Sequence, residues 1–566
     1  MPIRLSGINS GLDTDAIVKE LVSAYSLKTE KYEKQKTKIE WKQDAWKSLN
    51  TKIYGLYTNI SNLRFESAYN LKKTTVSDST KATVTATSGA VTGTQRLNVL
   101  QTAQASYITG AYMGKDATAS STLKDLGYEG GNTTIKVKDS EGKETAIEIT
   151  AETKVSDLIG KFKDAGLNAN FDTNNNRIFL SAKESGKAGD FDIVAEDSDA
   201  YSVLSTLGLA SKEDAAEEIK RQAKEYNKLY AEWESLKKSG ETDEETTKKI
   251  QELKEKINSY SADIKGVAAG VKKAEDVVDE SKLATKIEGQ DAIIKLNGVE
   301  FTSSSNTFTV NGLTIEAQAV TGDGDENAVA INTTVDTQGI YDKIKDFLSE
   351  YNSVINEITK LYNADSAKDY EPLSDEERES MSDEQIEKWE NKIKSALLRR
   401  DNSLGNIMNA MVNSMSQTFE IDGQKLSLSS FGISTLGFLN AAENEQYAYH
   451  IDGDEDDENT SGKKDKLMAA IQEDPDSIMK FMQKLTSNLY TSIDNKMKST
   501  ELSSAYKVYN DKELDKEAKE IENLIEKWED KIAEQEDAYF KKFSQMEVAL
   551  SKLQSQTNSL SGLLGQ

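Results

Sequence analysis

The longest regular pattern of apolar side chains lies near the start of the sequence. From Val18 to Leu63, one stripe recurs at alternating steps of three and four residues, the heptad spacing of a helix that packs along one face. Asp13 precedes the stripe and is a favourable N-cap. We predict one long helix that begins near residue 13. Its candidate coiled-coil or oligomer interface positions are Val18, Leu21, Ile39, Trp46, Leu49, Ile53, Leu56, Ile60 and Leu63.

This stripe is uneven along its length. Its first half is interrupted by three polar residues that share one register position, Lys28, Gln35 and Lys42. From Trp46 onward it is continuously apolar. We therefore expect a weak first half and a strong second half of the helix face.

A matching stripe lies at the other end of the chain. Its candidate interface positions are Ile525, Trp528, Ile532, Phe543, Met546, Leu550, Leu553, Leu560 and Leu564. An isolated amphipathic helix is marginal in water and must find an apolar partner. Neither stripe has a local partner in the sequence, so we expect the two ends to pair with each other and with copies of themselves.

The middle of the chain has a different pattern. Residues 74–110, 133–194 and 291–320 contain short alternating apolar and polar runs, which are typical of strands. Asn297-Gly298 and Asn311-Gly312 predict two tight hairpins. Residues 212–265 are charged and helical in pattern, with Gly240 between two helical faces.

These patterns predict an α+β fold in which long terminal helices form a coiled-coil stalk and β-rich head domains are inserted between them. An extra helical hairpin lies in the head. The expected segments are 1–70, an N-terminal tail and stalk helix; 71–115, a β-containing stalk or leg segment; 116–210, an α+β head domain; 211–287, a helical insertion; 288–335, a β-rich head domain; 336–500, a helical leg segment with a β part at 419–449; and 501–566, the C-terminal stalk helix.

Charge and composition narrow the possible partners. The formal net charge of -27 disfavours binding to nucleic acid or anionic lipid. The absence of cysteine excludes disulfides and thiolate chemistry. No apolar run approaches the ~18 residues of a membrane span, and no apolar core of a signal peptide follows Arg4. We therefore expect neither membrane insertion nor a cleaved signal peptide.

Candidate catalytic and metal-binding chemistry is weak. GINSG lacks the lysine and hydroxyl residue of a phosphate-binding loop. His450 is the single histidine, so a two-histidine zinc motif is impossible. Asp452, Asp454 and Asp456 resemble the start of a calcium loop, but Asp457 and Lys463 occupy the positions that need glycine and glutamate. We predict no enzyme activity, no catalytic residues, no cofactor and no metal.

Several blocks of the sequence resemble one known family. They are GINSGLDTDAIVKELVSAY near the start, TGTQRLNVLQTAQA at 92–105, QDAIIKLNGVEFTSSSNTFTVNGLTIEAQAV at 290–320, YEPLSDEERESMSDEQIEKWENKIKSALLRRDNSL at 370–404 and the closing MEVALSKLQSQTNSLSGLLGQ. Together they are similar to the flagellar hook-associated protein 2 family, which caps the flagellar filament. Residues 212–265 depart from that pattern.

The resemblance implies a structural role. It implies a ring-like homo-oligomer, a pentamer, at the distal tip of the bacterial flagellar filament, where it promotes folding and polymerisation of exported flagellin and prevents loss of flagellin subunits. It also implies an extracellular location, export by the flagellar type III system and an export chaperone before secretion. On this reading the weak half of the first helix keeps the contacts of the legs reversible as the cap advances; the alternative is that its polar residues simply face solvent.

Three other interpretations stay open from the sequence. The helix–head–helix layout also suits another axial protein of the flagellum, such as a hook–filament junction protein or flagellin, although the block at 370–404 argues against it. An exposed head could have a secondary role in cell adhesion. An enzyme is disfavoured by the near absence of histidine and cysteine.

Overall fold

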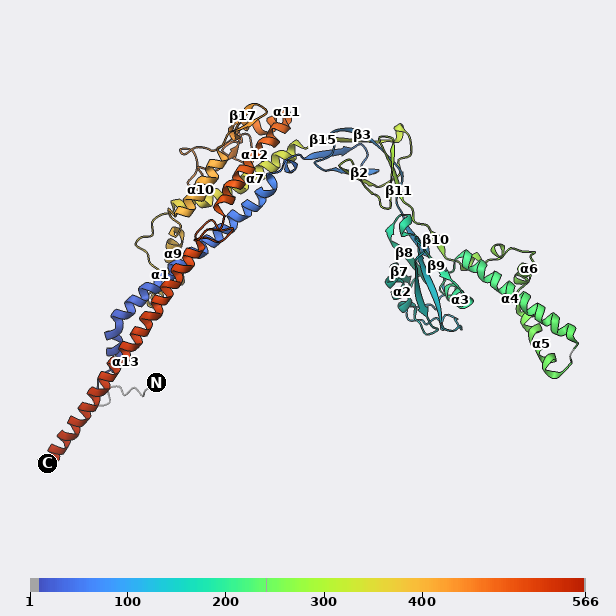
Figure 1. The fold of residues 1–566 in the computed structure, drawn as a ribbon, viewed down its shortest axis with the longest axis horizontal. Coiled ribbons are helices and arrows are strands. Elements are labelled where there is room, and N and C mark those ends of the chain that lie inside the picture. The colour runs from blue at the N-terminus through green and yellow to red at the C-terminus, as the bar shows by residue number, and fades with distance from the viewer. Residues whose placement is uncertain (1–9, 241, 564–566) are drawn as a thin grey trace. The chain divides into compact units, whose positions relative to one another are not determined.

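The computed structural model describes residues 10–240 and 242–563 (Figure 1). The chain divides into two compact units: one is built from both ends of the chain, up to Leu71 and from Val335, and the other is Lys72–Thr334. The first is mainly helical and the second contains most of the strands, so the fold is mixed helix and sheet.

The unit built from the chain ends holds two very long helices and several shorter ones. Asp13 caps the first helix as predicted, accepting a hydrogen bond from the Ala16 amide at 3.0 Å. Ser374 and Ser382 each form a capping box at the start of a shorter helix. The helices are α1 (Thr14–Leu63), α7 (Thr337–Asn363), α8 (Asp375–Glu379), α9 (Asp383–Ala396), α10 (Asn402–Met415), α11 (Lys466–Glu473), α12 (Pro475–Lys496) and α13 (Asp511–Leu563).

The core of this unit lies where the second half of α1 meets α7, α10 and α12. Ile53, Leu56 and Ile60 of α1 are completely buried there. Within the predicted helical leg segment, residues 466–496 form two helices separated at Asp474. Pro475 starts the second of them with Asp474 as its N-cap, because proline lacks the amide that a continuous helix would need at that position.

The prediction of a β-rich stretch over 419–449 is wrong in extent. Its strands are only two or three residues long: β16 (Phe419–Ile421), β17 (Gln424–Leu426), β18 (Ile433–Ser434) and β19 (His450–Ile451). Leu428 and Phe431 are buried from a 3₁₀ turn, so apolar spacing here reflects packing of a compact loop and not a sheet.

The inserted unit contains two β cores. One is formed by a five-stranded sheet of order β1-β15-β3-β11-β12 and a three-stranded sheet of order β13-β14-β2. Its strands are β1 (Lys72–Val76), β2 (Ala82–Ala86), β3 (Gly93–Gln101), β11 (Ala292–Leu296), β12 (Val299–Ser303), β13 (Thr307–Val310), β14 (Leu313–Ala317) and β15 (Val329–Val335). The sequence analysis placed 71–115 and 288–335 in separate segments, whereas the structure pairs their strands in shared sheets.

The second core joins a four-stranded sheet of order β10-β4-β8-β7 to a three-stranded sheet of order β6-β5-β9 and two short helices. The elements are β4 (Ala105–Thr109), β5 (Thr133–Asp139), β6 (Glu144–Ile149), α2 (Val155–Asp164), β7 (Asn168–Asp172), β8 (Arg177–Ser185), β9 (Phe191–Ala195), α3 (Ser198–Thr206) and β10 (Thr285–Ile287). Asn297 and Asn311 adopt positive φ in the two predicted hairpin turns.

Residues 212–265, whose pattern predicts helix, form most of α4 (Lys212–Ser239), α5 (Glu244–Ser259) and α6 (Ala262–Ala268). Gly240 ends α4 in the left-handed conformation, with a φ of 75°. Tyr226 packs edge-on against Tyr260, with ring centroids 5.7 Å apart. The base of the insertion is closed by a hydrogen bond of 3.0 Å from the Ala284 amide to the Ala210 carbonyl.

Candidate functional site

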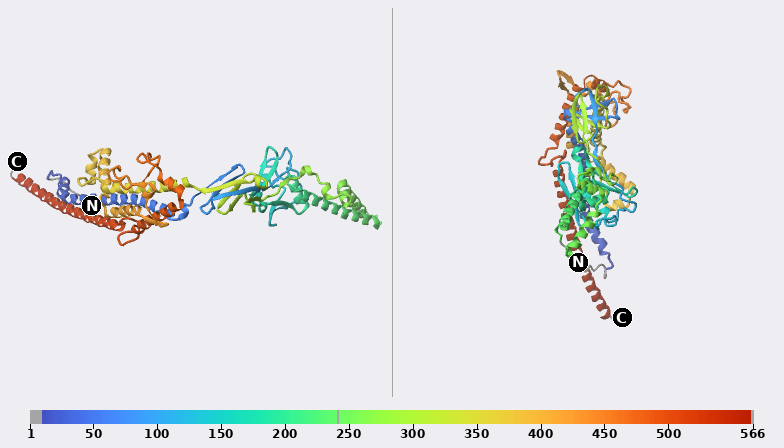
Figure 2. Two further views of the ribbon diagram at one scale, coloured as in Figure 1. Left: turned by 90° about the horizontal axis from the view of Figure 1, so that it is seen from above. Right: turned by 90° about the vertical axis from the view of Figure 1, so that its right-hand side faces the viewer.

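The candidate site is the surface shared by α1 and α13, which run side by side in Figure 1 and in the left view of Figure 2. Trp46 stacks on Tyr509, which precedes α13, at 5.0 Å, and Gln43 donates to Asp515 at 2.8 Å. Farther along, Tyr25 meets Trp528 at 6.3 Å. Residue numbers rise on α1 as they fall on α13, so the two helices are antiparallel.

The two halves of the α1 stripe differ as the sequence predicts. In the second half, Trp46, Leu49, Ile53, Leu56 and Ile60 are buried and Leu63 is half-buried. In the first half, Val18 is buried and Ile39 is half-buried. Leu21 is 43% exposed.

The α13 stripe becomes more exposed toward its end. Its half-buried positions are Ile525, Trp528, Ile532, Phe543, Met546 and Leu550. Leu553 and Leu560 are 58% and 59% exposed. Leu564 lies outside the described residues. The contact of Ser10 with Glu547 comes just before α1 begins at Thr14, so the stretch of α13 from Val548 to Leu563 runs on past the start of α1.

The polar interruptions of the α1 stripe make specific contacts. The Lys28 ammonium lies 4.5 Å from the centre of the Trp528 ring, and Lys531 approaches the same ring at 4.7 Å. Lys42 forms an ion pair of 3.0 Å with Asp401, the N-cap of α10. Cation–ring contacts and exposed ion pairs are weak compared with apolar burial, so this half of the contact is polar and shallow.

Sequence reasoning missed a second set of contacts on α1. Lys34 forms an ion pair of 2.8 Å with Glu377 of α8, and the ammonium of Lys394 on α9 lies 4.5 Å from the Trp41 ring. The capping boxes revealed that α8 and α9 exist, but no local pattern indicates which distant helix they contact. These two helices hold α1 on a side that α13 does not cover.

Carboxylates also gather beside this contact. Burial and the negative charges of Glu529, Asp375 and Glu30 raise the pKa of Glu33 above its ordinary value of 4.5. The raised pKa means that ionised Glu33 is less favourable in the folded chain than in the unfolded chain.

Replacing Glu33 with glutamine is therefore expected to stabilise the protein at pH 7, by of order 1 °C in melting temperature. The gain should shrink as the pH falls through the raised pKa and vanish below 4.5, where the carboxyl is protonated in both states. Thermal unfolding of both chains between pH 4 and 8 checks this. Glu20→Gln, an exposed change on the same helix, is the control, and an equal gain there would contradict the explanation.

The acidic loop after His450 is neutralised by the protein itself. Lys345 of α7 pairs with Asp454 at 2.7 Å and Asp456 at 2.6 Å, and it holds the pKa of Asp456 below its usual value. His450 contacts Asp457 at 2.6 Å. Within the described residues, no group of three or more acidic or histidine side chains is arranged to hold a metal ion.

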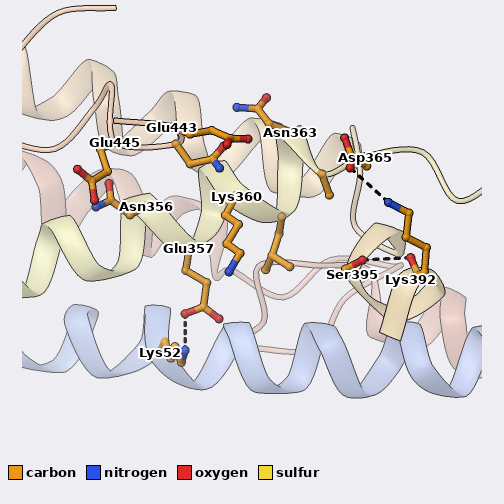
Figure 3. A pocket seen from close by; sticks show the side chains of 13 residues that line it. Lys52, Asn356, Glu357, Lys360, Asn363, Asp365, Lys392, Ser395, Glu443 and Glu445 are labelled. Carbon is orange, nitrogen blue, oxygen red and sulfur yellow. Dashed lines mark hydrogen bonds and ion pairs between the residues drawn. The ribbon is translucent and has the colours of Figure 1, made fainter. Parts of the chain in front are cut away.

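A polar hollow of 870 Å³ lies between α1, α7, α9 and the loop that contains Glu443 and Glu445 (Figure 3). Lys52 pairs with Glu357 across it, and Lys392 pairs with Asp365 at 3.3 Å. Two of the lysines that line the hollow are thus paired with carboxylates of the same hollow. None of the helices described between residues 10 and 563 combines the length and apolar character needed to cross a bilayer.

Comparison with known proteins gives consistent matches at both ends of the chain. A family model described as "Flagellar hook-associated protein 2 N-terminus" matches residues 10–106, and one described as "Flagellar hook-associated protein 2 C-terminus" matches residues 289–555. A relative named flagellar hook-associated protein 2 from Halalkalibacterium halodurans is 22% identical over 99% of both chains. A relative of the same name from Thermotoga maritima is also 22% identical, over 99% of this chain and 96% of its own.

Solved structures show a more distant likeness. The crystal structure of the D1-D2-D3 domains of the flagellar cap protein FliD from Escherichia coli aligns with a TM-score of 0.45 at 16% identity, over 79% of this chain and 95% of that one. FliD from Pseudomonas aeruginosa aligns with a TM-score of 0.27 at 16% identity, over 50% of this chain and 93% of that one. Values this low do not establish a common overall fold.

Proposed function

The chain belongs to the flagellar hook-associated protein 2 family, and on that premise we infer that it is a structural cap of the bacterial flagellar filament. The observation that carries this inference is the match of both chain ends to the family, together with a relative aligned over 99% of each chain. The role is one of assembly and not of catalysis.

We propose further that the cap sits at the distal tip, outside the cell, after export by the flagellar type III system. There it promotes the folding and polymerisation of flagellin and prevents flagellin subunits from escaping. Copies of the chain form a ring, for which the family suggests five members, and a chaperone holds the chain before export. We also propose that the chain has the stalk, leg and head segments expected from its sequence.

The α1–α13 pair supports this role physically. The second half of α1 is anchored by completely buried residues such as Ile53 and Leu56, which pack in the core with α7, α10 and α12, whereas α13 continues past α1 with Leu553 and Leu560 exposed. An apolar helix face that its own chain leaves exposed is favourable for contact with another chain. We propose that the end of α13 joins the cap to neighbouring copies or to the filament.

Gold-labelled antibody against this protein on intact flagellated cells, viewed by electron microscopy, tests the proposed function. We expect label confined to the distal tips of filaments. Label at the hook junction or along the filament would assign the chain to a different axial role, and a strain that lacks the gene provides the background control.

A further inference from the structure

Two surface features of the unit built from the chain ends expose large apolar or aromatic side chains. The first, here called the apolar tip, is Phe438 and Leu439, which are 83% and 95% exposed. The tip follows Gly437, whose φ of 78° turns the chain outward between β18 and β19. Consecutive apolar side chains with so little cover are unusual on a soluble protein and mark a contact surface.

The apolar tip borders a hollow that suits an aromatic ring. Phe438 lines a space of 540 Å³ together with Tyr362, Met408 and Tyr447. Aromatic rings and a methionine sulfur pack favourably around an inserted aromatic side chain. The other end of the loop is fixed to α7, because the Asn352 side chain bonds both the amide and the carbonyl of Tyr449, at 2.8 and 2.7 Å. The loop therefore presents the tip on a firm base.

The second feature, here called the aromatic face, is the set Tyr54, Tyr57, Phe65, Tyr490 and Tyr506. Its rings form one connected series: Tyr506 meets Tyr54 at 5.7 Å, and Tyr57 stacks on Tyr490 at 4.6 Å. The Arg64 guanidinium lies between Tyr490 and Phe65, at 4.4 and 5.0 Å from their centres. Tyrosine and arginine are the residues that most often dominate binding at protein interfaces.

The outer members of the aromatic face are held exposed. Tyr54, Phe65 and Tyr506 are 39%, 51% and 55% exposed. Tyr506 has a φ of 63°, a left-handed conformation that side chains other than glycine rarely adopt. The side-chain amide of Asn50 fixes the Tyr506 backbone by donating a hydrogen bond of 3.1 Å to the Tyr506 carbonyl. A strained residue that displays an aromatic ring to solvent points to a binding role for that ring.

The tip and the face lie on different sides of α1. Lys52 lines the polar hollow together with Glu443 and Glu445 of the loop that carries the tip (Figure 3). Tyr54 follows Lys52 by two residues, which places it roughly 200° around the helix. A tip on one side and a receptor on the other cannot meet within one chain, but they can join successive copies. Such head-to-tail contacts generate rings when the rotation between copies closes.

The charges around the two features are complementary. Between Phe438 and Gln446 the loop has two glutamates and no basic residue. The aromatic face has Arg64 within it and Lys507 directly after Tyr506. The carboxylate that contacts this face, Asp494, accepts a hydrogen bond from Tyr57 at 2.9 Å. On a chain with a net charge of -27, a contact that sets glutamates against basic residues avoids the repulsion that most pairs of its surfaces would suffer.

We propose that the apolar tip of one copy packs against the aromatic face of the next copy, with Tyr506 or Tyr54 entering the hollow beside Phe438. This inference deepens the proposed function, because it names a surface through which cap subunits meet. This contact would lie between the units built from the chain ends, and it would act in addition to any contact made by the end of α13.

Paired cysteines test the contact in a chain that has none of its own. The double variant Leu439→Cys with Tyr506→Cys is oxidised as purified protein and on intact cells, then run on a non-reducing gel. A disulfide needs Cα atoms within about 7 Å, so two sites on different sides of one chain must link different copies. We expect a ladder of multimers from the double variant and none from either single variant. The matched control joins Leu439→Cys to Val271→Cys, an 81% exposed site in the other unit.

A second variant keeps the test independent of disulfide geometry. Leu439→Asp is expected to shift the purified protein toward monomers in analytical ultracentrifugation, while Val271→Asp leaves its size distribution unchanged. Thermal unfolding should be the same for both variants and the parent chain. The proposal is overturned if the double cysteine variant gives no ladder as purified protein or on cells. It is also overturned if Leu439→Asp leaves the size distribution unchanged.

The outcomes separate this inference from the proposed function. If the antibody labels filament tips but the double cysteine variant forms no cross-links, the proposed cap function stands and only the tip–face contact is refuted. If the cross-links form but the antibody labels the hook junction or the length of the filament, the cap function is refuted and the tip–face contact stands. If Leu439→Asp stopped filament growth without changing oligomer size, the tip would bind a different filament protein and the proposal would be wrong.

Discussion

Replacing Ile53 with aspartate is expected to destabilise the unit built from the chain ends strongly. Ile53 is completely buried on α1 and belongs to the cluster that joins α1 to α7, α10 and α12. The change removes an apolar side chain from a packed core and places an unpaired carboxylate there. Together these effects destabilise a fold by about 4 kcal/mol or more, which corresponds to a fall in melting temperature of about 10 °C.

Thermal unfolding followed by circular dichroism measures this effect directly. Thr58→Asp is the matched control, because it introduces the same charge on an exposed position of the same helix. We expect the control to unfold within about 2 °C of the parent chain. Equal melting temperatures for Ile53→Asp and the parent chain would show that the buried stripe does not hold the helices together.

Replacing both Leu553 and Leu560 with glutamate is expected to abolish filament growth without changing the stability of the chain. Both side chains are more than half exposed on the part of α13 that runs past α1, so the change should alter the free energy of unfolding by less than about 0.5 kcal/mol. In an assembly the same positions would bring charge into an apolar contact, where it is costly.

Swimming assays and electron microscopy of filament length measure the effect on assembly. The melting temperature of the purified protein measures the effect on stability. Val548→Glu is the matched control: Val548 is 54% exposed but lies roughly 140° around the helix from Leu553. We expect normal filaments from the control. Normal filaments from the double variant would remove these leucines from the proposed interface, and a large fall in its melting temperature would show that they support the fold instead.

The long helices were the most predictable part of the fold. Heptad spacing and the Asp13 cap located α1, and the observed helix begins at Thr14 and ends at Leu63. Local patterns of this kind depend on each helix alone. The pairing of α1 with α13 was inferred only from the lack of other partners. The contacts that align them, such as Lys28 on Trp528, involve residues that look polar or incidental in sequence.

The strands were recognised more easily than their partners. Alternation marked β3 and β11, yet it could not indicate that these strands, almost two hundred residues apart, share one sheet. Pairing across such a distance is decided by tertiary packing, which local spacing does not encode. The same limit explains the compact loop around Leu428 and Phe431, where apolar spacing resembled a sheet.

The buried positions of α1 were predictable from the sequence, whereas the polar contacts around this helix were not. Ile53, Leu56 and Ile60 follow from periodicity because burial rewards apolar residues at fixed spacing. Lys34 with Glu377 and Lys394 over Trp41 give no such signal, since charged residues recur throughout this chain. Likewise Phe438 and Leu439 are ordinary apolar residues in the sequence, and only their exposure in the structure distinguishes them.

The closed base of the helical insertion makes it a natural grafting position for protein engineering. Because the Ala284 amide bonds the Ala210 carbonyl, the chain leaves and rejoins the β core at almost one point. The first turns of α4 pack on the core. The length of the rest of the insertion is therefore not determined by the sheet. A foreign hairpin, an epitope or a small folded module fused there would find its two ends already adjacent, and a cell carrying such filaments would display that cargo in one copy per cap subunit.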